Sequence, residues 1–298
     1  MESITPKYSK VQVWLECSAS CNEVAKSLNQ AVVYLTNAIH FNQTIKVAVK
    51  YSNFGPDSNT IGNCTPNLLM DTNDGFIQKP SALLRQTNSI HVDIDMVINL
   101  NANQKGQHLE EVICHELLHG LGFVSAVGTS LFGSPLTYVF NEGLTYIMDR
   151  YILHHGLKLS SSLKDSGLNQ LMKDATIEGT LVFTTGRKII PLETSLSPFQ
   201  LGSSVSHLSH AKYDNSRDLL MTHRISGNNN LAAYIKANGK WLTSPYGPDT
   251  LAILQTIGYT LNPNPSLVNA YSATPSIQPS CLIFSLFYLL SYFYFFMM

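Results

Sequence analysis

The chain has 298 residues, of which 44% are apolar, and this is ample for one large or two small domains with a buried core. Charged residues make up only 13%, and 19 basic residues nearly balance 20 acidic ones. Because no basic run or basic helical face is present to neutralise phosphates, the sequence argues against a nucleic-acid-binding protein.

The first hundred residues show the periodicities of a strand, a helix and two further strands. Apolar and polar residues alternate over 11–15 and over 45–51, as in half-buried strands. Between them, residues 22–41 carry apolar side chains at helical spacing. A further strand is predicted over 90–100, whereas the Gly, Asn and Pro content of 55–74 predicts a loop. Another loop is predicted over 227–238.

The cysteines and the N-terminal residues indicate in which cellular compartment the protein is expected. Five cysteines are too few and too unevenly spaced to predict a disulfide framework. A link from Cys17 or Cys21 to Cys64 and unpaired thiols both fit the sequence. Acceptor sequons begin at Asn42 and Asn63 and favour secretion, although residues 1–9 show no signal peptide.

The C-terminal residues predict a membrane-directing segment. Residues 281–298 are uncharged and apolar, and as a helix they would span roughly 27 Å, close to a bilayer core. Residues 261–280 are rich in Pro, Ser and Asn and predict a flexible stalk behind a globular domain over 1–260. A glycolipid-anchor signal and a retained transmembrane helix both remain open. In either case we expect an extracellular or cell-surface protein associated with a membrane.

The segment 110–123 reads EEVICHELLHGLGF and carries the chemistry. On a helix, His115 and His119 share one face, so both imidazoles can reach one ion, and Glu116 lies beside them to accept a proton. Zinc lowers the pKa of water to about 7 and polarises carbonyls, so this combination predicts peptide hydrolysis by metal-activated water. Cys114 points about 100° around the helix from His115, and we expect it to pack in the core.

A tetrahedral catalytic zinc site needs a third protein ligand. In the pattern H-E-x-x-H-x-x-G-x-x-H the last position here is Ser125, which cannot replace a nitrogen ligand. Downstream, His207 and His210 precede the sequence LLMTH, whereas Glu142 would be the carboxylate ligand of a gluzincin. The residues alone leave these alternatives open.

The combination of HELLHGLGF, SHLSHAKYD and LLMTH resembles the leishmanolysin-like branch of the metzincin zinc peptidases and related secreted bacterial peptidases. The resemblance extends from Val11 to Tyr259. It implies an α+β domain with a twisted mixed sheet, a motif helix beside a cleft, an insertion before the third histidine and a Met-turn. Carried over by position, it makes His207 the third ligand in preference to His210, and Met221 the Met-turn residue.

We therefore expect a zinc endopeptidase in which His115, His119 and His207 hold one catalytic Zn²⁺ and Glu116 is the general base. Its partners would be protein or peptide substrates and a membrane. A second hypothesis is a cell-surface binding protein that keeps the peptidase fold without catalysis, and a third is a gluzincin that uses Glu142. Three further histidines are expected at the surface or behind the ligands: His154, His155 and His223.

Overall fold

The computed structural model describes residues 2–3, 10–18, 20–55, 58–71, 77–87, 90–103, 109–127, 145–159, 170–171, 173–200, 202–224 and 244–263. Over these residues the chain is a mixed α+β structure with several sheets. No helix among them is long and apolar enough to cross a bilayer. Glu142, the loop predicted over 227–238 and all but the first three residues of the predicted stalk and tail lie outside the described residues.

The largest sheet is built on the predicted strand, helix, strand unit. Strands β2 (Val11–Cys17) and β4 (Ile45–Ser52) pair in parallel, and α1 (Cys21–Ala38) connects them. Inward-facing residues of β2 and β4 are almost fully buried, as their alternation predicts. The sheet order is β1-β2-β4-β8-β5, with β1 (Glu2–Ser3) and β5 (Gly62–Pro66) antiparallel to their neighbours and β8 (Met96–Asn101) parallel to β4.

One sequence prediction about this region was wrong, and a second was confirmed only in part. The segment 55–74 contains β5 and β6 (Leu68–Asp71) rather than only a loop. Its polar composition hides β5 because this strand forms the sheet edge, where alternate residues are exposed. The strand predicted over 90–100 is present only from Met96 onward, because the preceding backbone carbonyls of Ile90, Val92 and Ile94 accept hydrogen bonds from the Arg85 and Asn67 side chains.

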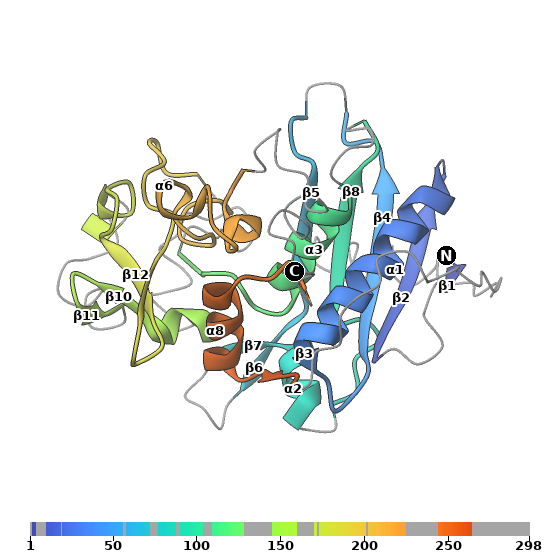
Figure 1. Ribbon diagram of the computed structural model, residues 1–298, viewed down its shortest axis with the longest axis horizontal. Coiled ribbons are helices and arrows are strands. Elements are labelled where there is room, and N and C mark those ends of the chain that lie inside the picture. Colours follow the sequence, from blue (N-terminus) through green and yellow to red (C-terminus); the bar gives the residue numbers. More distant parts are fainter. Residues whose placement is uncertain are drawn as a thin grey trace, which may run out of the picture.

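Helix α3 (Leu109–Gly120) carries the motif and packs beside α1 against the large sheet (Figure 1). Its apolar residues belong to the same buried cluster as the inward residues of β4 and β8. Burying an aliphatic side chain contributes about 1.5–3 kcal/mol, so this face anchors the helix. The buried apolar side chains of the helix are Val112, Ile113, Cys114, Leu117 and Leu118.

A second, four-stranded sheet lies at the left of Figure 1, with α3 and α8 (Pro248–Ile257) between it and the large sheet. Its order is β11 (Leu157–Lys158), β10 (Ile152–His154), β12 (Leu181–Thr184) and β13 (Ile189–Pro191). One apolar cluster runs from Val11 to Tyr259 and includes residues of both sheets. The other described helices are α2 (Ser81–Thr87), η2 (Ile147–Tyr151), α6 (His210–Tyr213) and η3 (Leu219–Met221). Strands β3 (Ile39–His40) and β14 (Thr260–Leu261) form a two-stranded sheet. Strands β7 (Ile77–Pro80) and β9 (Thr145–Tyr146) form a three-stranded sheet with β6.

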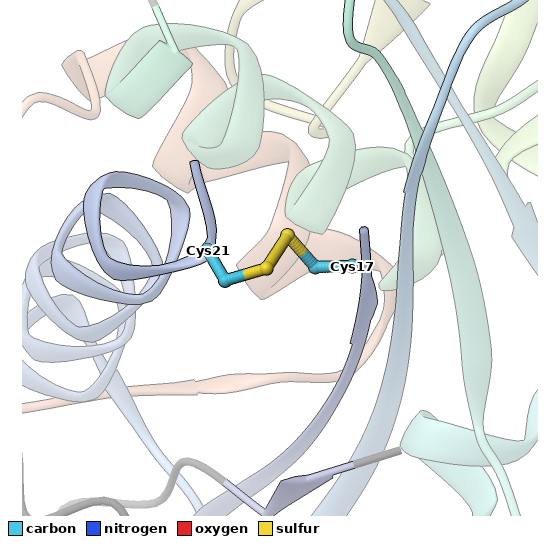
Figure 2. The surroundings of a disulfide bond; sticks show 2 residues. All are labelled: Cys17 and Cys21. Carbon is cyan, nitrogen blue, oxygen red and sulfur yellow. A yellow bond between two sulfur atoms is a disulfide. The ribbon is translucent and has the colours of Figure 1, made fainter. Parts of the chain in front are cut away.

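Cys17, at the end of β2, and Cys21, at the start of α1, form a disulfide (Figure 2). The suggested link of either residue to Cys64 is therefore wrong. Cys64 lies in β5, three strand positions from β2, which corresponds to about 14 Å and exceeds the reach of a disulfide. Cys64 and Cys114 are free, and Cys114 is fully buried, as its position on the helix predicts.

Asp95 provides a test of this packing. It is fully buried, and its carboxylate accepts hydrogen bonds from the Arg85 guanidinium, the Ser81 hydroxyl and the Lys46 amide. Asp95→Ala leaves the guanidinium without its anion, so we expect the free energy of unfolding to fall by about 3–5 kcal/mol. Asp95→Asn, which keeps an acceptor, should lose less. Urea denaturation measures both values, and equal losses in the two variants would contradict the importance of the charge.

Candidate metal centre

Helix α3 brings the two motif histidines together. His115 and His119 are four residues apart on one face, and their Nε2 atoms lie 2.9 Å from each other. The rings meet edge to face, with centroids 4.6 Å apart. The helix alone therefore supplies two ring nitrogens that point to one place.

His207 joins this pair from the C-terminal part of the chain. Its Nε2 lies 3.1 Å from that of His115 and 3.2 Å from that of His119. In the part of the chain that the structure describes, these three residues form one of two clusters of ligand-type side chains compact enough for an ion, and His210 belongs to neither. We call them the three-histidine site; their role as metal ligands stays a prediction.

The backbone around His207 is held on two sides. Its carbonyl accepts a hydrogen bond from the Glu193 amide at 2.8 Å, and the next amide, of Leu208, donates to the Met221 carbonyl at 2.8 Å. Glu193 follows β13, and Met221 ends η3. The second sheet and η3 together therefore set the position of the His207 ring.

Each ring of the three-histidine site has a backbone carbonyl behind it. A carbonyl oxygen only accepts hydrogen bonds, so each Nδ1 carries the proton and each Nε2 presents its lone pair. The three lone pairs thus point into a common volume. The Nδ1 atoms donate to Leu220 O from His115 (2.6 Å), to Phe123 O from His119 (2.6 Å) and to Ser203 O from His207 (2.9 Å).

Burial keeps these rings neutral. Desolvation lowers the pKa of His115 and puts that of His207 well below its usual value, while desolvation and the neighbouring His115 lower the pKa of His119 to about 3. Neutral rings protonated on Nδ1 carry no proton on Nε2, so the three Nε2 atoms cannot hydrogen-bond to one another. Two nitrogens bound to a tetrahedral zinc ion lie about 3.3 Å apart, close to the observed 2.9–3.2 Å. The donor set therefore fits a zinc-class ion.

The end of α3 positions one of these carbonyls. The Gly122 amide donates to His119 O at 2.9 Å and the Phe123 amide donates to Leu118 O at 3.1 Å, which are the two hydrogen bonds of a Schellman motif. Gly122 has a φ of 102°, in the region that favours glycine, and an added Cβ would lie 2.6 Å from Pro80 Cγ. This glycine therefore ends the helix and directs Phe123 O at the His119 ring.

Glu116 lies between the two motif histidines in the sequence of α3 and is 5% exposed. Desolvation raises the pKa of its carboxyl to about 8. A divalent cation nearby would favour the carboxylate form and lower this pKa again. In β5, a Cβ added to Gly62 would lie 3.2 Å from Glu116 Oε1, so the absence of a side chain there leaves the carboxyl group room.

Ser125, at the last position of the metzincin pattern, connects the two halves of the site. Its hydroxyl donates to Asp149 Oδ1 at 2.5 Å, and its amide donates to Ser206 Oγ at 3.1 Å. Ser206 precedes His207 in the chain. Ser125 thus links the segment after α3 to the segment that carries the third histidine, a role for which the sequence contains no signal.

Glu193 is a fully buried carboxylate behind His207. It accepts hydrogen bonds from the His210 amide, from Ser195 and from His223 Nδ1 at 3.1 Å. Burial raises the pKa of Glu193, but these hydrogen bonds outweigh it and lower the pKa to about 2. His210 therefore supports this loop through its backbone, and its Nε2 lies 3.6 Å from Asp214 Oδ1. The sequence does not single out Glu193.

The three remaining histidines occupy different surroundings. The His223 ring contacts the Glu193 carboxylate, and its side chain is mostly buried. His154 and His155 instead meet Asp174 in a separate cluster. His154 is 1% exposed, so the surface alternative is wrong for this residue: its ring points inward from β10.

One protein family, described as SPBPB7E8-like, matches residues 157–279. This stretch includes His207 and Met221 but not α3, and it covers less than half of the chain. No curated protein matches the sequence. The family description specifies no reaction, so any assignment of function depends on the geometry of the site.

The pKa of Glu116 makes stability depend on pH in the metal-free protein. The folded carboxyl holds its proton up to about pH 8, whereas the unfolded one ionises near its usual pKa of 4.5. The contribution of the Glu116 carboxyl to the free energy of unfolding is fully present below pH 4.5 and is lost as the pH rises through 8. We expect wild type to lose free energy of unfolding relative to Glu116→Gln over this window. Urea denaturation after chelation measures the difference, and parallel pH profiles would contradict it.

Proposed function

We propose that the chain is a zinc-dependent endopeptidase of the metzincin type, related to the leishmanolysin-like branch. The observation that carries this proposal is the convergence of three neutral imidazole Nε2 atoms, 2.9–3.2 Å apart, two of them from a helix that also carries the buried Glu116. His115, His119 and His207 would hold one Zn²⁺ and leave a position for water or substrate. A packed structural role for these histidines would leave three lone pairs facing one another without a donor.

The residues of the site have separable roles in this reaction. Zinc, when bound, acts as a Lewis acid that activates water and polarises the scissile carbonyl. Glu116 accepts a proton from the attacking water on its carboxylate and then donates it to the leaving amine. The Leu220, Phe123 and Ser203 carbonyls keep the three imidazoles in the ligand tautomer.

The edge strand β5 supports a peptide as substrate. Over the described residues β5 pairs only with β8, and Gly62 in this strand lies beside Glu116. An extended peptide can add to such an edge through main-chain hydrogen bonds. This arrangement would lay a scissile bond along the strand next to the general base. Delivery to a membrane surface through residues 281–298 remains part of the proposal.

The identity of the third ligand can be tested by zinc content. His207→Ala removes one of three protein donors, so we expect zinc affinity to fall by more than about 100-fold. His210→Ala and Glu142→Ala should keep the ion. Zinc is measured by mass spectrometry after dialysis against a weak chelator. Loss of zinc only in Glu142→Ala would favour the gluzincin alternative.

The role of Glu116 can be tested with an isosteric variant. Glu116→Gln preserves the shape of the side chain but cannot accept a proton, so we expect kcat to fall by about 10²–10⁴-fold while zinc is retained. Cleavage of a fluorogenic peptide library by wild type and variant measures the effect. Wild-type activity in Glu116→Gln would overturn the mechanism. Zinc binding without any hydrolysis by wild type would favour a catalytically inactive binding protein.

A further inference from the structure

The hairpin formed by β10 and β11 places two consecutive histidines at its turn. His154 pairs with Leu157 across the hairpin, so His155 and Gly156 form a two-residue loop. Both have positive φ, 49° and 80°, as a type I′ turn requires. Asn and Gly are the usual residues at such positions, and a histidine there adopts a backbone conformation that most side chains avoid.

The left-handed backbone at His155 brings its ring to the side of His154. In a continuing strand the two side chains would point to opposite faces. Here the ring centroids are only 4.4 Å apart. His154 Nε2 lies 2.9 Å and His155 Nε2 lies 3.3 Å from the same atom, Asp174 Oδ2. The strained turn thus gathers two imidazole nitrogens around one carboxylate oxygen.

Asp174 is held in place by the segment that precedes β12. Gln170 Nε2 donates to its other oxygen, Oδ1, at 2.8 Å. The Asp174 backbone carbonyl accepts a hydrogen bond from the Thr180 hydroxyl. The amide of the next residue, Ala175, donates to the Leu171 carbonyl, as in a helix. Asp174 is 7% exposed, so its carboxylate is a fixed group and not a mobile surface charge.

We propose that His154, His155 and Asp174 form a second metal site, which we call the hairpin site, for a divalent transition-metal ion of the zinc class. One ligand atom from each residue lies within 4.8 Å of the others. The two measured N···O distances, 2.9 and 3.3 Å, match the spacing of about 3.3 Å between donors around a tetrahedral ion. Two imidazoles with one carboxylate are a donor set that zinc, nickel and copper accept.

The surroundings also allow an ion to enter and give it a structural role. The His155 side chain is 60% exposed, whereas that of His154 is 2% exposed, so the site has one open and one enclosed side. An ion there would join the turn of the β10–β11 hairpin to the segment before β12. Since β10 pairs with both β11 and β12, the ion would fix the turn between β10 and β11 to the segment that leads into β12.

The test compares zinc content in five full-length proteins: wild type, His155→Asn, Asp174→Asn, His119→Ala and the double variant His155→Asn/His119→Ala. Asn accepts the left-handed backbone of the turn, so His155→Asn removes a ligand without changing the hairpin. Each protein is stripped with chelator, reloaded with zinc and dialysed. We expect His155→Asn to hold one zinc ion fewer per chain than wild type, and the double variant one fewer than His119→Ala. Asp174→Asn, which keeps hydrogen-bonding capacity, should lose the same ion.

Unchanged zinc content in His155→Asn and Asp174→Asn would overturn the hairpin site and leave a hydrogen-bonded cluster. A zinc ion that is lost in His155→Asn but kept in His119→Ala supports the site even if the three-histidine site binds nothing. The two proposals therefore fail separately. Cobalt gives a second readout, because its visible absorption in His119→Ala should disappear when His155→Asn is added.

Discussion

Three hydrogen bonds from imidazole Nδ1 to backbone carbonyls are the constraint on which the centre of this protein depends. Each fixes a ring's orientation and tautomer at once, and together they force three lone pairs into one volume. The carbonyls come from η3, from the turn after α3 and from the loop before His207. Small shifts in any of these backbones would therefore separate the nitrogen atoms.

The surrounding polar network is arranged to prevent such shifts. Glu193 joins the loop of His207 to β13 through its backbone, and its carboxylate draws together Ser195, His210 and His223. Ser125 joins the end of α3 to Ser206. A buried carboxylate with several donors is stable as an anion, and removing one donor leaves an unsatisfied charge. The Ser125 contact thus fixes the His207 segment to the end of α3, and the Glu193 contacts fix the same segment to β13.

The spacing of apolar residues along the chain was enough to predict the individual helices and strands whose burial pattern is regular. The strands that contain Val11 and Ile45, the helix between them and the motif helix all follow from the spacing of apolar residues. Strand β5 escaped detection because its neighbour β8 lies far along the chain and its own residues are mostly polar.

The site was predictable only where side-chain identity carries information. His115 and His119 follow from helical geometry, whereas the preference for His207 over His210 came from family resemblance. Backbone carbonyls such as Phe123 O have no sequence signature, since every residue has one. Asp149 and Glu193 are ordinary acidic residues until the fold buries them.

The distance along the chain between the histidines has a consequence for biosynthesis. His207 follows His115 by 92 positions and His119 by 88. At typical translation speeds the third imidazole emerges from the ribosome on the order of ten seconds after the helix pair. A nascent or prematurely terminated polypeptide therefore carries only two of the three proposed ligands, and two protein donors alone would hold an ion poorly. Metal uptake by the proposed centre would therefore require that synthesis has passed position 207.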